Sequence, residues 1–383
     1  MSSNRESRTV LLTLGRLPVA LELARALHSV GWRVLVADPY AWHLCRLSNT
    51  VHGSFKVTAP AADEQRYLQE LEKIIADEQV SLVIPVSEET LFVSTLKTRV
   101  HDSVEVLCMH QDSLLQLHDK YRFARFAKEL GLSVPVTVLA DDIPAREALM
   151  SRPFVVKPRL SCSGTGVRFG VAGDAFASSE NNDRHIVQQR LSGEACCSFS
   201  IAAAGITLTS VCYRSLLEAG SVSICFEQMP VPEGITRFID TVVRETRYTG
   251  MIAFDFIEND KGIWCAIECN PRSTSGIHFI NHKNLTSSLI DKVACVPDHL
   301  TGRRQEFWSC LKQVQGALFK RQINRPGWKN LFRTRDITLQ RSDLKPFVLM
   351  TFIMAPQLFR SLRSGIPLSE VLMSDVGWHE HSR

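Results

Sequence analysis

The chain has 383 residues, of which 45% are hydrophobic and 22% charged, and its formal net charge is +4 at pH 7. This length and composition predict a globular protein of two or three domains and exclude a disordered or fibrous chain. The charge is unevenly spread, because residues 301–383 hold 14 Lys/Arg against 6 Asp/Glu, whereas residues 1–300 hold 30 against 34. We interpret residues 301–383 as a separate basic extension with a solvated helical face, and we expect no nucleic-acid partner.

The eleven cysteines are scattered, with no Cys-x-x-Cys pair and no zinc-ligand spacing. They are typical of reduced thiols in a cytoplasmic protein. The first residues contain no apolar run suited to a signal peptide. The longest apolar stretch, residues 346–359, is interrupted by Pro356 and is too short to span a bilayer, so we expect no transmembrane segment.

Residues 1–110 alternate between short apolar runs and amphipathic stretches, which predicts a parallel sheet flanked by helices. Asp38, Glu88 and Glu89 follow apolar runs, at the carboxyl ends of the expected strands. Ligands commonly bind at such ends, and the alternative for each residue is a solvated turn. The pattern Gly-x-Gly-x-x-Gly is absent, so we expect no nicotinamide cofactor.

The middle of the chain has a different pattern, with strands joined by short turns. Residues 110–131 are predicted to be helical, with Gly131 as the stop signal. Residues 153–157 and 167–171 are two expected strands, and the small residues between them indicate a flap rather than a phosphate loop of the Gly-x-x-x-x-Gly-Lys-Ser/Thr type. Further strands are expected over 185–189, 196–203 and 207–213, and helices over 236–246 and 285–296.

The strongest chemical signal is a hairpin formed by residues 251–258 and 262–268. Asp255 lies between Phe254 and Phe256 and must point away from them, whereas Glu268 and Asn270 are two apart and share a face. Three oxygen-bearing side chains thus converge, and oxygen ligands are what magnesium prefers. Arg272 follows directly and suits a phosphate or carboxylate beside that metal. The alternative is an exposed hairpin with ordinary charges, which the apolar run before Glu268 disfavours.

Two lysines add to this signal. Lys157 lies on an apolar strand, where a charge is costly unless an anion pairs with it, and that anion is either a phosphate or a structural carboxylate. The loop that follows offers backbone N–H groups and hydroxyls that suit phosphates. Lys120 directly precedes an expected helix. The pattern of residues 187–194 indicates a strand followed by a turn.

In this order and spacing, these four segments resemble the ATP-grasp superfamily. The resemblance covers about residues 10–295 and is mainly to the group that contains biotin carboxylase and the ATP-binding halves of carbamoyl-phosphate synthetase large subunits. Single-copy carboxylate–amine ligases, including L-amino-acid ligases, have a similar plan. The resemblance implies α/β and α+β architecture: a Rossmann-like domain over 1–110, an ATP-grasp domain over 111–300 and the basic helical extension over 301–383. Within the ATP-grasp domain, residues 111–190 would form the linker helix and flap, and residues 191–300 the metal-binding part.

The resemblance also implies a role for each matched position. Lys120 and Lys157 would contact the nucleotide phosphates, and the flap loop would close over them through Ser161, Ser163, Gly164 and Gly166. The adenine hinge would include Gln188, Gln189 and Leu191, and Glu194 would bind the ribose. Asp255, Glu268 and Asn270 would hold magnesium, which manganese can replace. Arg272 and Lys157 would act in catalysis by stabilising the transferring phosphoryl group.

The implied activity is an ATP- and magnesium-dependent ligase that converts a small carboxylate to an acyl phosphate and couples it to an amine such as an amino acid. One alternative is carbamoyl-phosphate-type chemistry on bicarbonate, and the other is a nucleotide-binding protein without ligase activity. A homodimer remains open. The apolar segment 344–362 is expected to be covered, with packing on the body of the chain as the default, a second protomer as the next alternative and a membrane surface as the last.

Overall fold

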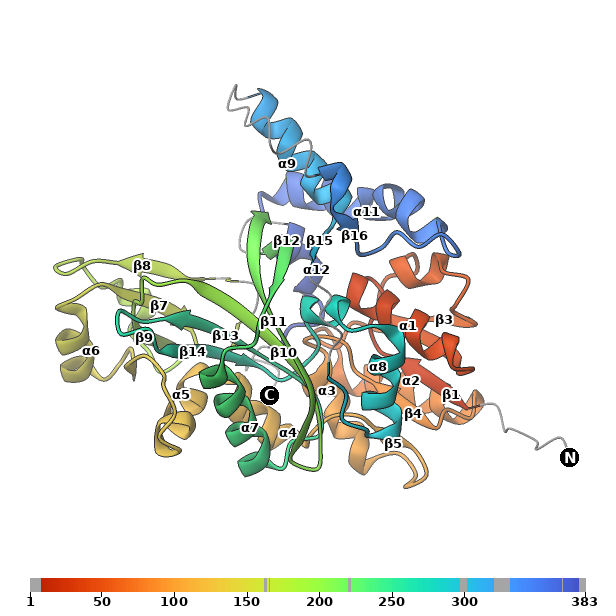
Figure 1. Ribbon diagram of the computed structural model, residues 1–383, viewed down its shortest axis with the longest axis horizontal. Helices are drawn as coiled ribbons and strands as arrows, with labels where there is room; N and C mark the ends of the chain where they lie inside the picture. The colour runs from red at the N-terminus through yellow and green to blue at the C-terminus, as the bar shows by residue number, and fades with distance from the viewer. Residues whose placement is uncertain are drawn as a thin grey trace, which may run out of the picture.

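The computed structural model describes residues 8–161, 164, 166–219, 222–296, 302–319, 331–366 and 368–378. In these residues the strands form an N-terminal sheet, a small sheet and a long central sheet (Figure 1). The helices have these bounds: α1 (Pro18–Ser29), α2 (Glu64–Asp77), α3 (Thr90–Val93), α4 (Gln111–His118), α5 (Lys120–Glu129), α6 (Ile143–Met150), α7 (Glu233–Thr246), α8 (His282–Thr286), α9 (Phe307–Phe319), α11 (Lys345–Ser364) and α12 (Leu368–Met373).

The N-terminal sheet is parallel throughout, with the order β3-β2-β1-β4-β5, as the sequence predicts. Val10 and Leu12 face one hydrophobic cluster, which includes α1, and Leu11 faces another, which includes α2. Helices therefore cover both faces, which explains why the three inner strands β2, β1 and β4 are mostly apolar and buried. The bounds are β1 (Thr9–Leu12), β2 (Arg33–Asp38), β3 (Gly53–Lys56), β4 (Leu82–Ile84) and β5 (Glu105–Val106).

The predicted helix over residues 110–131 is broken in two. Asp119 adopts an extended backbone conformation between α4 and α5, and its carboxylate accepts hydrogen bonds from the backbone N–H groups of Tyr121 and Arg122. An aspartate that caps a first turn competes with continuation of the preceding helix. The break matters for the site because it makes Lys120 the first residue of α5.

The small sheet, in the order β6-β9-β7-β8, is antiparallel and forms one arm of the molecule. The central sheet has the order β14-β13-β10-β11-β12-β15-β16. The bounds are β6 (Thr137–Leu139), β7 (Phe154–Pro158), β8 (Arg168–Gly170), β9 (His185–Gln189), β10 (Ala195–Ala203), β11 (Ile206–Ala219), β12 (Val222–Met229), β13 (Gly250–Glu258), β14 (Trp264–Asn270), β15 (Arg303–Gln305) and β16 (Arg335–Asp336).

The hairpin β13–β14 has one apolar and one polar face, as the alternation of its residues predicts. Phe254 and Phe256 are fully buried, where they pack with Phe238 of α7, and Phe254 also contacts Phe123 of α5. This aromatic cluster fixes the face on which Asp255 must lie. Asp255 is paired directly with Glu268 across the hairpin.

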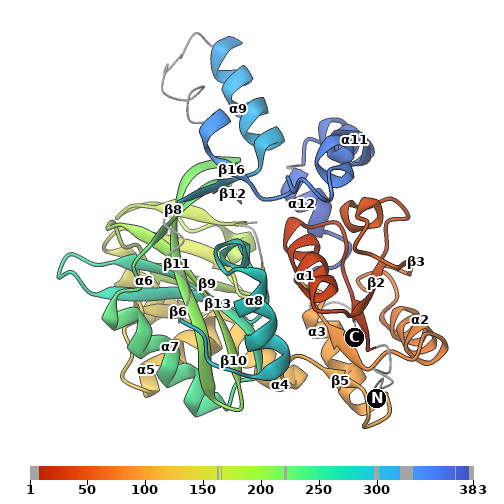
Figure 2. The same ribbon diagram turned by 45° about the vertical axis from the view of Figure 1, so that its right-hand side comes forward.

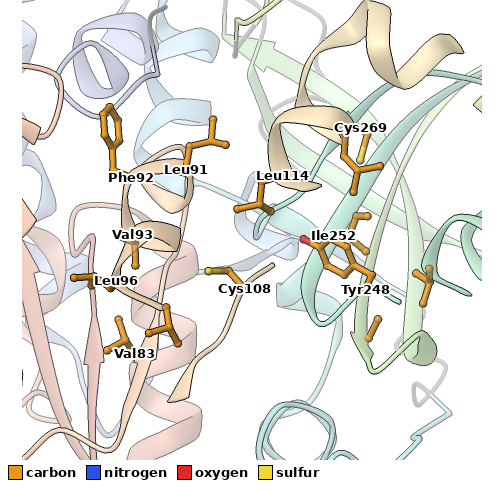
Figure 3. Packing of buried hydrophobic residues seen from close by; sticks show 14 of the residues in the cluster. Val83, Leu91, Phe92, Val93, Leu96, Cys108, Leu114, Tyr248, Ile252 and Cys269 are labelled. Atoms are coloured by element: carbon orange, nitrogen blue, oxygen red, sulfur yellow. The ribbon is translucent and has the colours of Figure 1, made fainter. Parts of the chain in front are cut away.

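One hydrophobic cluster runs from the N-terminal sheet into the central sheet (Figure 3). Val83, Leu91 and Phe92 belong to the N-terminal part, whereas Tyr248 and Ile252 belong to the central part, and Leu114 of α4 lies between them. A second link joins Glu22 of α1 to His278 and His282 by hydrogen bonds of 2.9 and 2.8 Å. The two parts are therefore held together by packing and by polar contacts.

The C-terminal residues return to the N-terminal part (Figure 2). Buried Asp343 accepts from Arg25 Nε at 3.0 Å and from Ser48 Oγ at 2.6 Å, and Asp375 pairs with Arg16 at 2.7 Å. The expectation that the chain covers segment 344–362 is nevertheless wrong for one side of α11, where Phe352 is 74% and Phe359 67% exposed. Within the described residues, no helix combines the length and apolar character that crossing a bilayer requires.

In the structure, the helix predicted over 285–296 begins earlier and is shorter than predicted. α8 starts at His282, a π-helical turn follows over Ser287–Asp291, and Lys292 then takes a left-handed conformation that ends it.

Candidate active site

The polar face of the hairpin carries two carboxylates, those of Asp255 and Glu268, and the side-chain amide of Asn270 donates a hydrogen bond to each of them. Asn270 Nδ2 donates to Asp255 Oδ2 at 3.2 Å and to Glu268 Oε1 at 3.3 Å. Burial and the neighbouring charge of Glu268 raise the pKa of Asp255 to about 7. Burial acts in the same direction on Glu268, but Lys120 and Lys157 overcome it and lower the pKa of that carboxyl to about 2. Two partly buried carboxylates this close repel each other and favour a cation.

The donor set of this site fits magnesium. It consists of carboxylate and amide oxygens, which suit a hard cation that shares its coordination with phosphates. The described residues contain no group of three or more His, Cys, Asp or Glu side chains that could hold a metal ion, so a cation here would be held by the two carboxylates and the amide. The amide of Asn270 presents its nitrogen to the carboxylates, so it must turn about its own axis to present its oxygen to a cation.

Two buried lysines face the acidic pair from neighbouring elements. Lys120 Nζ lies 3.8 Å from Glu268 Oε2 and donates to the backbone oxygen of Ser161 at 2.8 Å. Lys157 Nζ donates to the neutral Gln188 Oε1 at 2.9 Å, and in the described residues it has no carboxylate within ion-pair distance. Burial lowers the pKa of Lys157. A buried lysine without a counter-ion is suited to receive an anionic ligand.

Arg272 contacts the amide of Asn270, which bridges the acidic pair. Its Nε donates to Glu88 Oε1 at 2.6 Å, and its Nη2 donates to Asn270 Oδ1 at 3.1 Å. Turning Asn270 toward a cation would therefore release one N–H of this guanidinium for an anion. His118, to which sequence reasoning gave no role, lies beside the Glu88–Arg272 ion pair, with its Nε2 3.8 Å from Glu88 Oε2. Its position two residues before Lys120 was the available signal.

Asp38, Glu88 and Glu89 are all buried, which excludes the solvated-turn alternative for each of them. Asp38 accepts from Gly15 N and binds the Arg16 guanidinium, and Glu89 accepts from Thr13 and from two backbone N–H groups. Both are satisfied within their own domain. Glu88 alone reaches across to the hairpin, through Arg272.

The expected adenine hinge lies where the small sheet meets the hairpin. Gln188 is buried and donates from Nε2 to Ile267 O at 3.4 Å, which joins β9 to β14. The backbone N–H of Gln189 donates to Val136 O at 2.8 Å, Leu191 is half-buried, and Glu194 is exposed. These four positions stay predictions, because no contact in the structure assigns them a ligand.

The flap loop begins at Ser161, which Lys120 contacts through both its backbone oxygen and its hydroxyl. Gly164 and Gly166 are exposed, and Ser163 lies outside the described residues. Gly166 has a φ of +72°, and a Cβ there would lie 2.8 Å from Pro158 Cγ, so the loop requires glycine at this position.

Comparison with known protein families gives a match over the part of the chain that carries this site. Residues 117–276 match the family model described as the ATP-grasp domain. No curated protein matches the sequence. The matched range contains both lysines, the hairpin and Arg272.

Solved structures of similar fold cover most of the chain. N5-carboxyaminoimidazole synthetase from Staphylococcus aureus has a TM-score of 0.59 at 13% identity, over 75% of this chain and 77% of that one. The biotin carboxylase domain of 2-oxoglutarate carboxylase from Hydrogenobacter thermophilus, in complex with MgADP, ADP and bicarbonate, has a TM-score of 0.59 at 13% identity, over 77% and 73%. L-amino acid ligase from Bacillus licheniformis has a TM-score of 0.57 at 14% identity, over 71% and 69%. At these identities the likeness shows the fold alone.

Proposed function

We propose that this chain, which carries an ATP-grasp domain over residues 117–276, is an ATP- and magnesium-dependent ligase that activates a small carboxylate as its acyl phosphate and couples it to an amine. The observation that carries the proposal is the convergence of an acidic pair, two buried lysines and an arginine. A cation site beside two buried lysines, of which Lys157 has no carboxylate within ion-pair distance among the described residues, is the arrangement that phosphoryl transfer needs.

The nucleotide would lie between the small sheet and the hairpin. Lys157 and Lys120 would hold its phosphates, while the backbone of the hinge and the side chains of Gln188 and Gln189 would contact the adenine. Leu191 would pack against the base, and Glu194 would bind the ribose. The loop from Ser161 to Gly166 would cover the phosphates and keep water from a reactive acyl phosphate.

The metal would be held by Asp255, Glu268 and Asn270, with manganese able to replace magnesium. When bound, it would neutralise charge on the phosphate oxygens. Arg272 would then stabilise the carboxylate oxygen that attacks the γ-phosphorus. As the carboxylate oxygen bonds to the γ-phosphorus, the bond from that phosphorus to the β-phosphate oxygen breaks and ADP forms. The amine then displaces phosphate from the acyl carbon to form the amide, and the proton that its nitrogen loses passes to solvent.

The remaining parts of the proposal are a cytoplasmic location, where reduced thiols and ATP are present, and small-molecule substrates rather than nucleic acid. The structural likeness to an L-amino acid ligase supports an amine nucleophile such as an amino acid. A homodimer stays open. We also propose that the domain boundaries lie near residues 110 and 300.

The test is ADP formation from ATP with a panel of amino acids, small carboxylates and bicarbonate, alone and in pairs. We expect ADP release to need a carboxylate and an amine together, and Glu268→Gln to lower it by about two orders of magnitude or more. The matched control, Asp260→Asn at the exposed turn of the same hairpin, should leave the rate unchanged. ADP release with bicarbonate alone would favour carbamoyl-phosphate-type chemistry, and nucleotide binding without turnover would favour a non-catalytic binder.

A further inference from the structure

One side of α11 is apolar and faces solvent. Five exposed residues form this apolar stripe: Val348, Phe352, Ala355, Phe359 and Leu362. Their separations alternate between four and three positions, so they lie above one another on a single side of the helix. At 1.5 Å per residue the stripe is about 21 Å long. Val348 is 54% exposed and Leu362 73%, so the stripe is open over its whole length.

The opposite side of α11 is anchored, so the apolar stripe cannot turn inward. Trp308 Nε1 of α9 donates to Phe347 O at 2.8 Å, and the two rings lie 5.6 Å apart. Met350 packs against the hydrophobic cluster that includes α1. Just before the helix, Asp343 pairs with buried Arg25. Both views show α11 and α9 at one end of the molecule (Figure 1, Figure 2). The exposure of the stripe is therefore a property of the folded chain.

The exposed charges of this region are all positive. In residues 331–366, apart from position 340 and the other uncharged residues, the exposed charged side chains are Arg333, Arg335, Arg341, Lys345, Arg360 and Arg363. The two acidic side chains of the same range, Asp336 and Asp343, are buried and accept hydrogen bonds from within the fold. α11 itself contains no acidic residue. A partner of this surface must therefore supply both an apolar contact and negative charge.

The position of the cations on α11 relates them directly to the stripe. Lys345 lies three positions before Val348, and Arg363 follows Leu362, so basic side chains stand at both ends of the apolar stripe. A helix that combines bulky apolar residues with Lys and Arg binds at the interface of a bilayer, where the apolar side enters the acyl boundary and the cations meet phosphate groups. The long stems of Lys and Arg allow their charges to reach the head groups.

Other occupants fit this surface less well. A second copy would bring cations against cations, because α11 offers no acidic residue in return. Pro356 lies inside the helix and disfavours a regular seam with another helix. A nucleic acid would use the charges but would leave the apolar stripe in water. An acidic protein would need carboxylates at matching positions, whereas a bilayer presents anionic groups everywhere along its surface.

We propose that the apolar stripe of α11, together with Lys345, Arg360 and Arg363, is a docking surface for an anionic lipid bilayer. The helix lies in the bilayer interface and does not cross it, which agrees with the absence of a membrane-crossing helix among the described residues. The inference does not depend on the proposed ligase function, and it assigns a partner to a part of the chain that lies outside the ATP-grasp match.

The first experiment uses the full chain and needs no variant. Flotation with vesicles of phosphatidylcholine alone is compared with flotation with vesicles that contain about 30 mol% phosphatidylglycerol. We expect at least about 10-fold stronger binding to the anionic vesicles, and weaker binding as salt is raised from about 50 mM to about 500 mM. Absence of binding, or equal binding to both vesicles, would overturn the inference.

The second experiment locates the surface. Replacing Phe352 and Phe359 together with serine should weaken binding to the anionic vesicles by about 10-fold or more. A triple change of Lys345, Arg360 and Arg363 to glutamine should remove the preference for phosphatidylglycerol. All five residues are exposed, so the melting temperature should stay that of the unaltered chain.

Two controls match these changes. Ile206→Ser replaces an apolar residue that is 63% exposed at the end of β11 away from α9, and Lys128→Gln removes an exposed cation from α5. Both should bind as the unaltered chain does. If the controls weaken binding as much as the α11 variants, or if the α11 variants bind normally, the surface lies elsewhere and the inference is wrong. A chain that ignores vesicles but forms a dimer that Phe352→Ser and Phe359→Ser dissolve would assign the stripe to a second copy, which also overturns it.

Discussion

Replacing Asp255 with asparagine should stabilise the metal-free protein while it removes the response to magnesium and nucleotide. The oxygens of Asp255 and Glu268 contact the same amide nitrogen at 3.2 and 3.3 Å, so they lie no more than about 6.5 Å apart. At an effective dielectric constant of about 20, two charges at that distance repel by at least about 2.5 kcal/mol. Asp255→Asn removes this repulsion.

The stability that Asp255→Asn gains should depend on pH, and the direction of this dependence follows from the raised pKa of Asp255. Because the folded protein holds the proton up to about pH 7, against 3.8 for an unperturbed group, the cost of the charged form grows as pH rises over that range and is complete above it. At pH 8 the variant should therefore melt a few degrees above the unaltered chain, and at pH 5 the difference should be smaller.

Thermal unfolding with and without MgADP is the assay. The unaltered chain should gain stability from MgADP and Asp255→Asn should not, and the control Asp260→Asn should behave as the unaltered chain in both conditions. A variant that melts lower without metal at pH 8, or that keeps the MgADP response, would refute the reasoning.

Three further predictions concern other parts of the chain. Lys157→Met should raise the KM for ATP by about 10-fold or more, as measured by ADP formation, whereas Lys128→Met on the exposed side of α5 should not; equal KM values would contradict the phosphate role. Asp343→Asn leaves the buried guanidinium of Arg25 without its charged partner and should cost about 3–5 kcal/mol in denaturant unfolding, so a loss below about 1 kcal/mol would show that the ion pair does not anchor the C-terminal region. A chain ending at residue 300 removes Asp343 and Asp375, which pair with Arg25 and Arg16, and should be poorly soluble or inactive; a soluble, monomeric and fully active product would contradict this.

The local chemistry of the hairpin could be predicted from the sequence because strand alternation decides which side chains share a face. Asp255 between two phenylalanines, and Glu268 two residues before Asn270, leave one arrangement that buries the aromatic rings. The parallel N-terminal sheet was predictable for a similar reason, since its inner strands are mostly apolar runs that alternate with amphipathic helices.

Contacts between distant segments were not predictable in the same way. Nothing in the local sequence shows that Glu88 meets Arg272 or that His118 lies beside them, because 184 positions separate the first pair. The helix break at Asp119 was missed because the residues on both sides favour a helix, and only the capping geometry reveals the break. The exposed side of α11 was missed because apolar content alone predicts burial.

The most direct test of the central claim follows the oxygen atoms of the activated carboxylate. A substrate acid identified by the panel is labelled with oxygen-18 in its carboxylate, and the products of one reaction are examined by phosphorus NMR and mass spectrometry. An acyl phosphate intermediate transfers one labelled oxygen to inorganic phosphate and yields ADP. The account predicts this result, and the appearance of AMP with labelled oxygen, or of phosphate without label, would contradict it.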